Sequence, residues 1–345
     1  MRGFRYFVQG TPAEQMPVIV PRICGVCSTA HHVASVKALE NALGVTPPKL
    51  ANEIRELLLL GQLIQNQATS LFIFTMPDRV GASSIFHMDD SEANPEQQLS
   101  LAQRALKVRQ IGTKLITLAG GQFIHPVKAI IGGVTSGIKA EDAKQMLTEM
   151  QDTITTACEL FDEYWDMSLA MRERIGTWGD DEPAYYIAST GVEKPQFNSS
   201  VIRVLGPNGN EMATFPPESF RDFLDYQTTD YSFAGKSSFE GKVLRANSLA
   251  RMNLTQSMGT PCADYYLERL TTEFGKPAHP ILLFDLCRGI ELVYAFERAI
   301  EMLSEDLDYE DTSVPYSLRD GEGYGLVEAP RSEEHTSELQ SRQSI

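Results

Sequence analysis

Long runs of apolar residues at three- and four-residue steps are the feature of this 345-residue sequence that most limits its fold. One run covers residues 50–75 and stops before Pro77, and a longer one covers residues 141–175 and is followed by Gly176. This spacing is the period of one face of an α-helix. Both stretches are therefore expected to be long helices that bury one side.

Other patterns predict further helices along the chain. Apolar positions favour a helix over residues 30–43, which Gly44 would end, and another over residues 91–118, which Ser91 would cap. Pro280 is suited to the first turn of a last helix, whose apolar side extends to about residue 300.

Residues 181–260 have a different texture. Short runs rich in β-branched and aromatic residues occur at 185–187 and 201–205, and the turn residues 207–209 precede a third run. We therefore predict a mainly α (α+β) protein, built as a long-helix bundle with a smaller β-containing subdomain. The expected units are 1–180 with the helical core, 181–260 with the β subdomain, 261–330 with the last core helix, and the tail 331–345.

Charge and composition exclude several classes of partner. The chain has 30 Lys and Arg against 46 Asp and Glu, a formal net charge of −16. Such an acidic chain is a poor ligand for nucleic acid or for an anionic membrane surface. No uninterrupted apolar run reaches the ~18–20 residues of a membrane-spanning helix, and the N-terminus lacks the apolar core of a secretory signal. We expect no transmembrane segment and a cytoplasmic location.

Only two of the five cysteines are close in sequence, which favours a reducing compartment over a disulfide framework. Cys24 and Cys27 are separated by two residues, and Gly25 between them suits a tight turn. A helix starting just after Cys27 would bring its positive end to the thiols and favour thiolates. On spacing alone, the pair fits half of a zinc site, a disulfide redox centre or part of a redox-metal cluster. The remaining cysteines are expected to be inert thiols: Cys158, Cys262 and Cys287.

The cysteine motif, taken with later motifs, resembles the large subunit of nickel–iron hydrogenases. The pattern Arg22-x-Cys24-Gly-x-Cys27-x-x-x-His31 is similar to the N-terminal metal-binding signature of that family. The likeness covers nearly all of residues 1–330 and is closest to the cytoplasmic, multimeric group. The other matching segments follow in the family's order: 54–57 through Pro77-Asp78, 120–126, 132–133, 248–253, 288–291 and 323–331.

The resemblance implies a nickel–iron centre held by four cysteine thiolates, with carbon monoxide and cyanide on the iron. Cys24 would ligate nickel, and Cys27 would bridge nickel and iron. His31 would hydrogen-bond the bridging sulfur and so tune the metal. The implied activity is the reversible oxidation of dihydrogen to protons and electrons.

Residues near the end of the chain complete the implied site. Pro330 and Arg331 match the family's Pro-Arg pair beside the diatomic ligands, where the guanidinium would assist in splitting dihydrogen. Glu328 belongs to the same motif, as Arg22 belongs to the first one. Asn66 can donate a hydrogen bond to a cyanide, although it cannot take a proton as a carboxylate does.

Several departures from the family pattern shape the expectations. The family's second cysteine pair has no counterpart before the chain ends, so we expect the chain as written to be incomplete and inactive alone. Arg5 replaces a glutamate that helps to hold magnesium, which argues against that ion. Residues 331–345 are polar, aperiodic and similar to a translated sequencing adapter, so we expect them to be non-native and the natural polypeptide to continue. The start is also expected to be incomplete.

The implied partners follow from electron flow. The chain has no cysteine set for iron–sulfur clusters, so an iron–sulfur small subunit is implied, along with maturation factors and nicotinamide- or deazaflavin-reducing subunits. Two other functions remain open. One is a non-catalytic structural or quinone-site relative in respiratory complex I, and the other is a zinc-stabilised binding module that uses Cys24, Cys27 and a histidine. His125 is expected to be a structural histidine rather than a proton relay.

Overall fold

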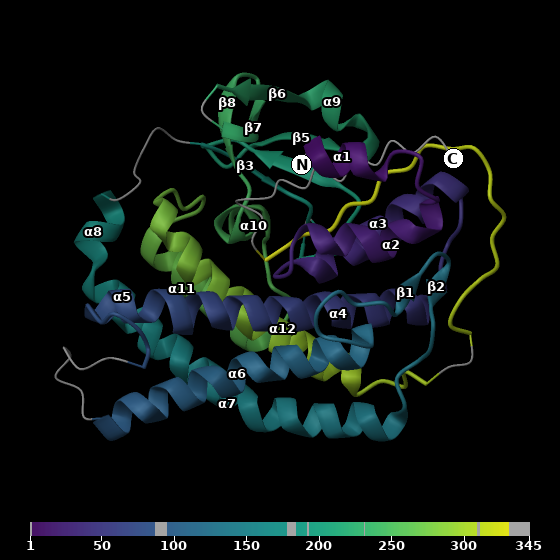
Figure 1. The fold of residues 1–345 in the computed structure, drawn as a ribbon. Coiled ribbons are helices and arrows are strands. Elements are labelled where there is room, and N and C mark those ends of the chain that lie inside the picture. Colours follow the sequence, from purple (N-terminus) through teal and green to yellow (C-terminus); the bar gives the residue numbers. More distant parts are fainter. Residues whose placement is uncertain are drawn as a thin grey trace.

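The structure is a computed structural model that describes residues 2–86, 95–177, 184–191, 193–230, 232–308 and 311–330. The described part is mainly helical, with a six-stranded sheet above a layer of long helices (Figure 1), which confirms the predicted fold class. The helices are α1 Arg2–Val8, η1 Ala13–Gln15, α2 Met16–Ile19, η2 Val20–Ile23, α3 Ser28–Leu43, α4 Lys49–Ala68, η3 Thr69–Thr75, α5 Met76–Val80, α6 Pro95–Gly120, α7 Ala140–Ala170, α8 Arg172–Thr177, η4 Pro217–Ser219, α9 Phe220–Phe223, α10 Ser248–Leu254, α11 Pro261–Phe274, η5 Ile281–Leu283 and α12 Phe284–Leu303. The strands are β1 Ala129–Ile130, β2 Gly133–Val134, β3 Tyr185–Ala188, β4 Ile202–Leu205, β5 Glu211–Phe215, β6 Leu224–Thr229, β7 Ser232–Phe239 and β8 Lys242–Arg245.

Helices α4 and α12 form the centre of the molecule. Helix α4 packs against α6 and α12, and α12 also packs against α7, α10 and α11. Two glycines make these crossings close. A Cβ at Gly112 of α6 would fall 2.7 Å from the carbonyl oxygen of Gly61 on α4, and a Cβ at Gly289 of α12 would overlap the ring of Phe161 on α7.

The two longest helical predictions are partly wrong about where the helices end. The helix that begins at Lys49 does not end before Pro77, because it continues through the π-helical η3 into α5. Pro77 lies in the first turn of α5, where its missing N–H is not needed, and Gly81, with φ 74°, ends that helix. The predicted helix over 141–175 is broken at Met171 into α7 and α8. Ser91, the predicted cap of the next helix, lies outside the described residues.

The continuous helix over Lys49–Arg79 also bears on the membrane prediction. Although the sequence has no uninterrupted apolar run of that length, this helix is long and apolar enough to cross a membrane. However, 78% of the 18-residue stretch with that composition is buried inside the protein. A helix that packs on several neighbours in this way fits the core of a globular fold, and its length and composition are weak grounds for a membrane span.

The sheet has the strand order β5-β4-β3-β8-β7-β6. Strands β3 and β8 are parallel, and the other neighbours are antiparallel. The runs at 185–187, 201–205 and after the turn 207–209 are strands as predicted. Helices α10 and α11, which follow the sheet in sequence, were not predicted.

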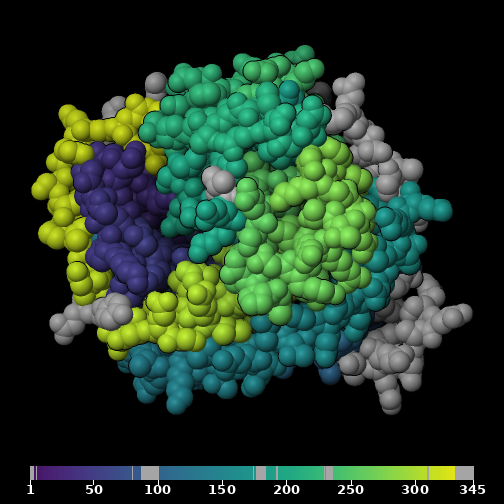
Figure 2. All heavy atoms as spheres, turned by 180° about the vertical axis from the view of Figure 1, so that it is seen from behind, coloured from purple at the N-terminus to yellow at the C-terminus, as the bar shows by residue number. Residues whose placement is uncertain are grey.

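The last described segment, 311–330, runs back along α3. A Cβ at Gly321 would lie 2.6 Å from the carbonyl oxygen of Ala42, and Gly323 and Gly325 make similarly close approaches to Ala38 and Ala34. The segment therefore lies flat against α3 and runs toward the N-terminal end of that helix. From behind, Figure 2 shows the yellow C-terminal part of the chain bordering the purple N-terminal part.

Candidate metal centre

The two motif cysteines lie where the short helix η2 gives way to α3. Cys24 follows η2 in an extended conformation, and Cys27 is the residue that precedes the first turn of α3. The backbone N–H of Cys27 donates a hydrogen bond to the Sγ of Cys24 over 3.2 Å. Hydrogen-bond donation and the positive end of α3 both favour a thiolate, which is the form that ligates metal.

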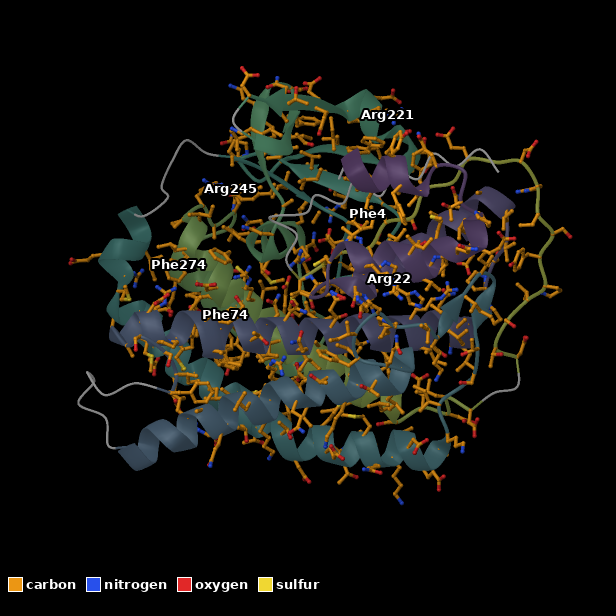
Figure 3. All side chains as sticks on the ribbon, in the orientation of Figure 1. Phe4, Arg22, Phe74, Arg221, Arg245 and Phe274 are labelled. Carbon is orange, nitrogen blue, oxygen red and sulfur yellow. The ribbon has the colours of Figure 1, made fainter. Side chains whose placement is uncertain are left out.

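The exposure of this loop differs from residue to residue. Cys27 is 3% exposed, Cys24 is partly buried, and Val26 between them is 48% exposed. A Cβ at Gly25 would meet nothing within 4 Å, and its φ lies outside the left-handed region, so the backbone here has no need of a glycine. Arg22, at the end of η2, is exposed and lies near the purple N-terminal helices in Figure 3.

The first turn of α3 is fixed by helix α4. The side-chain Oε1 of Gln62 accepts a hydrogen bond from the Ala30 N–H at 2.9 Å, and His31, on the same turn, is buried. One turn further along α4, the Nδ2 of Asn66 lies 3.3 Å from the carbonyl oxygen of Val26. The same amide nitrogen also donates to Gln62 O and Gln65 Oε1. A hydrogen bond from Asn66 to a diatomic ligand would thus have to replace one of these contacts, of which that to Val26 is the longest.

Two histidines close to the motif have different surroundings. His32 is buried, its Nδ1 lies 2.8 Å from the Pro17 oxygen, and its Nε2 accepts from the Ala129 N–H at 3.1 Å. These contacts select the tautomer with the proton on Nδ1, and burial lowers the pKa of His32 to about 4. The backbone N–H of His125 donates to the Oγ of Ser28, which brings the loop before β1 against the start of α3.

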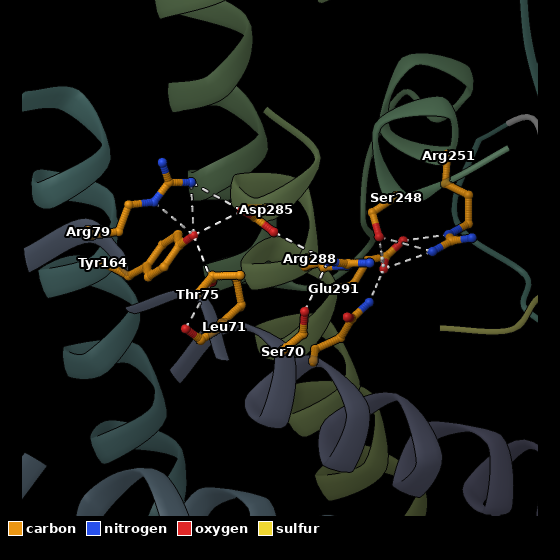
Figure 4. Close-up of polar contacts among 11 residues, drawn as sticks. Ser70, Leu71, Thr75, Arg79, Tyr164, Ser248, Arg251, Asp285, Arg288 and Glu291 are labelled. Atoms are coloured by element: carbon orange, nitrogen blue, oxygen red, sulfur yellow. Dashed lines mark hydrogen bonds and ion pairs between the residues drawn. The ribbon is translucent and has the colours of Figure 1, made fainter. Parts of the chain in front are cut away.

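Glu328 joins a buried network of charged and polar side chains. Its carboxylate accepts from the Ser189 N–H at 2.5 Å and from Arg251 Nη1 at 2.7 Å. Arg251 also donates from Nε to Glu291 at 2.5 Å, and the Nε2 of Gln67, next to Asn66, reaches the same carboxylate at 2.7 Å. Figure 4 shows the part of this network in which Arg251 and Ser248 meet Glu291.

The direction of the C-terminal segment relates it to the cysteine pair. Gly325 packs on Ala34, which is seven residues after Cys27, or about 10 Å along the helix. Five further residues lead from Gly325 to the buried Pro330, and an extended chain of that length spans at most ~17 Å. At Gly325 the chain is therefore running toward the end of α3 that carries the cysteine pair, and Glu328–Pro330 follow within that reach. Arg331, the tail 331–345 and the side chain of Arg5 lie outside the described part.

The two cysteines could supply only part of the ligands of a metal ion. Among the residues that the structure describes, no group of three or more His, Cys, Asp and Glu could hold a metal ion. Cys24 and Cys27 fit a pair of soft ligands to a redox metal, and a complete site needs further ligands. Burial raises the pKa of Cys158 to about 12 and that of Cys287 well above its usual range, as suits inert thiols.

Gln62 and Lys37 also contribute to this region, although neither was predicted from the sequence. Gln62 lies four residues before Asn66 on one face of α4, a spacing that could have drawn attention to it. Lys37 is on α3, and its partners lie in distant segments that no local pattern connects to it.

Comparison with known proteins shows to which family this arrangement belongs. The sequence profile of nickel-dependent hydrogenases matches residues 2–102. The matching polypeptide of the F420-non-reducing hydrogenase vhu of Methanocaldococcus jannaschii is 33% identical over 96% of this chain and 81% of its own length. The chain belongs to the nickel-dependent hydrogenase family. This hydrogenase chain is also 26% identical to the NAD-reducing hydrogenase HoxS subunit beta of Cupriavidus necator, over 96% of this chain and 72% of that one.

Solved structures agree on the fold. The hydrogenase chain superposes on an NAD+-reducing [NiFe]-hydrogenase with a TM-score of 0.86 at 24% identity, covering 96% of this chain and 75% of that one. A [NiFeSe]-hydrogenase from Dm. baculatum gives a TM-score of 0.77 at 19% identity, with coverages of 96% and 77%.

Family membership decides among the functions left open by the motif. The chain is a hydrogenase large subunit, an oxidoreductase that acts on dihydrogen and depends on nickel. Several relatives are named as one subunit of a hydrogenase. The zinc module and the complex I-like relative are not supported.

Proposed function

We propose that Cys24 and Cys27 are ligands of the nickel–iron centre of this hydrogenase, with Cys24 on nickel and Cys27 between the metals. The observation that carries the proposal is the convergence of the cysteine pair and Glu328–Pro330 toward the N-terminal end of α3. Two sequence segments that the resemblance assigns to one site are about 300 residues apart in the chain, and the direction of residues 321–325 along α3 supports the proposal that they meet.

The surrounding residues stabilise the thiolates and fix the backbone that carries the two cysteines. When bound, the nickel–iron centre supplies the place where dihydrogen is oxidised. The Cys27 N–H and the positive end of α3 stabilise thiolate at Cys24, and Gln62 holds the first turn of α3 in place through the Ala30 N–H. Asn66 fixes the loop between the cysteines through the Val26 oxygen.

Residues from the C-terminal motif would complete the site. Ser189 and Arg251 orient the Glu328 carboxylate. We propose that Pro330 and Arg331 lie beside carbon monoxide and cyanide ligands of the iron, with Arg331 assisting in the splitting of dihydrogen, and that His31 hydrogen-bonds the Cys27 sulfur. No magnesium ion is assigned, because Arg5 stands where the family has the glutamate that helps to hold magnesium.

Electrons would leave through an iron–sulfur small subunit. Exposed apolar side chains occur on α1, on α2, in the cysteine motif and in the loop bonded to Ser28, and exposed apolar surface is typical of an interface. They are Tyr6, Phe7, Val18, Val26, Ile124 and Val127. We further propose a cytoplasmic complex loaded by maturation factors and coupled to a nicotinamide- or deazaflavin-reducing subunit. The F420-non-reducing names of several relatives favour an acceptor other than a deazaflavin.

Metal analysis of cysteine variants tests the proposal. The complete gene, expressed with its partner subunits and maturation factors, would carry Cys24→Ser or Cys27→Ser, and Cys262→Ser on the exposed start of α11 serves as the control. Both motif variants should lose nickel and the infrared bands of carbon monoxide and cyanide, while the control keeps them. Full nickel and unchanged bands in either motif variant would refute the assignment.

A further inference from the structure

Lys37 joins three segments that are far apart in the sequence. It lies on α3, ten residues after Cys27, and its Nζ donates to the carbonyl oxygens of Asn198 at 2.9 Å, Ser199 at 3.3 Å and Leu326 at 2.5 Å. An ammonium has three N–H donors, and here each of them has a carbonyl acceptor. Lys37 is therefore held in place by hydrogen bonds to three residues, unlike a lysine that moves freely on the surface.

Burying the Lys37 ammonium is unfavourable, which indicates that its three hydrogen bonds have a structural role. Burial, together with the charge of Arg55 on α4, lowers the pKa of Lys37 to about 7, and Glu40 on α3 opposes them. An apolar side chain of similar length would avoid this desolvation, but it would leave three carbonyl oxygens without their donor.

The three acceptors lie in the two segments that hold Glu328. The Glu328 N–H donates to the Phe197 oxygen at 2.8 Å, and the Glu328 carboxylate accepts from the Ser189 N–H. The Oγ of Ser189 in turn donates to the Ser199 oxygen, which also accepts from Lys37. Leu326 is two residues before Glu328. The contacts therefore form a closed ring that runs from Lys37 through Leu326, Glu328, Ser189 and Ser199 back to Lys37.

We propose that Lys37 is a positioning residue for the metal centre: by tying Leu326 and residues 198–199 to α3, it sets where Glu328 and Pro330 lie relative to the cysteine pair. The position of the ring relative to the cysteine pair is fixed by α3, because this helix begins just after Cys27 and carries Lys37 near its middle. This inference rests on the proposed function, since it takes Cys24 and Cys27 as the metal ligands.

The test uses the holoenzyme with Lys37→Met, Lys37→Arg and, as a control, Lys144→Met at an exposed position of α7. Methionine keeps the length of the side chain and removes the donors, whereas arginine keeps the charge and several N–H groups. The first readout is hydrogen–deuterium exchange of residues 321–328. It includes the Tyr324 amide, bonded to Asn41 Oδ1, and the Glu328 amide, bonded to Phe197 O.

The second readout is the set of infrared bands from the diatomic iron ligands. We expect Lys37→Met to lower the protection of 321–328 about tenfold or more and to shift the bands, Lys37→Arg to restore both in part, and Lys144→Met to change neither. Unchanged protection in Lys37→Met would overturn the proposal. Lost protection with unchanged bands would also overturn the proposal, because Lys37 would then have only a structural role. Equal band shifts in the methionine and arginine variants would overturn it as well.

The outcome is separable from that of the cysteine experiment. If Cys24→Ser and Cys27→Ser retained nickel, the metal assignment would fail whatever Lys37 does. If they lost nickel while Lys37→Met left protection and bands intact, the metal assignment would stand and the role of Lys37 would fall.

Discussion

The guanidinium of Arg251 lies 2.5 Å from the carboxylate of Glu291 in a fully buried ion pair between α10 and α12. Gln67 and Ser248 donate to the same carboxylate, and Arg251 also reaches Glu328. Burial alone would lower the pKa of Arg251, but the charges of Glu291 and Glu328 raise it above its ordinary value. The pair thus connects the core to the segment that carries Glu328.

Replacement of Glu291 tests this connection. Glu291→Gln leaves Arg251 buried with one carboxylate instead of two, so we expect the free energy of unfolding to fall by about 3 kcal/mol. Urea titration of the purified holoenzyme measures this loss. The pair formed by the exposed Glu301 and the half-buried Arg298 provides the control, since Glu301→Gln should cost less than about 1 kcal/mol. Equal losses in the two variants would contradict a special role for the buried pair.

His32 predicts a pH dependence of stability. Its pKa is about 4 in the folded chain, against an ordinary value of 6.5. Between these values the unfolded chain binds a proton that the folded chain does not, so stability is fully present above pH 6.5 and is lost as pH falls toward 4. The loss from this site amounts to about 3 kcal/mol. Urea titrations at several pH values should show a flatter dependence for His32→Asn, and identical slopes would contradict the assignment.

The close approach of Gly323 to α3 predicts a steric effect. A Cβ there would lie 2.8 Å from the Cα of Ala42 and would overlap backbone atoms of Ala38 and Ala42. Gly323→Ala should therefore lift segment 321–330 away from α3 and cost about 1–3 kcal/mol. The same substitution at Gly25, where nothing lies within 4 Å, should leave the thermal midpoint unchanged. An unchanged midpoint in Gly323→Ala would show that the segment does not lie against the helix.

Local patterns predicted much of this fold and some of the site. The helix after Cys27, its end at Gly44 with φ 66° and the strands around residues 207–209 follow from periodicity and turn residues that lie close together in sequence. The two-residue spacing of the cysteines likewise predicts a metal site, and that assignment stays a prediction. Helix α11 also carries a local signal, because its buried residues Ala263, Tyr266, Leu267 and Leu270 have helical spacing, and it could have been predicted.

Other features depend on contacts that no local pattern contains. Lys37 and Leu326 are 289 positions apart, and only the folded chain shows that one binds the other. The continuation of α4 through the π-helix into α5 is of the same kind. Pro77 signals a helix end in the sequence, but residues of η3 and α5 are held by side chains of α7 and α12.

Tyr164 of α7 makes the contacts that hold this continuation. Its hydroxyl lies 3.0 Å from the Thr75 Oγ, accepts from Arg79 at 3.1 Å and donates to Asp285 at 3.1 Å (Figure 4). Tyr164→Phe leaves these partners buried without the hydroxyl, so we expect a loss of about 1–3 kcal/mol in the free energy of unfolding by urea. The same change at the exposed Tyr265 should cost less than about 0.5 kcal/mol.

The metal content of Tyr164→Phe distinguishes stability from site chemistry. Arg79 is 13 residues after Asn66, or about 20 Å along the helix, so the Tyr164 cluster lies far from the cysteine pair. Folded holoenzyme carrying Tyr164→Phe should therefore keep its nickel and iron and lose only stability. Loss of metal from fully folded protein would mean that the π-helical segment transmits its position to Asn66, and the two regions would then have to be treated as one.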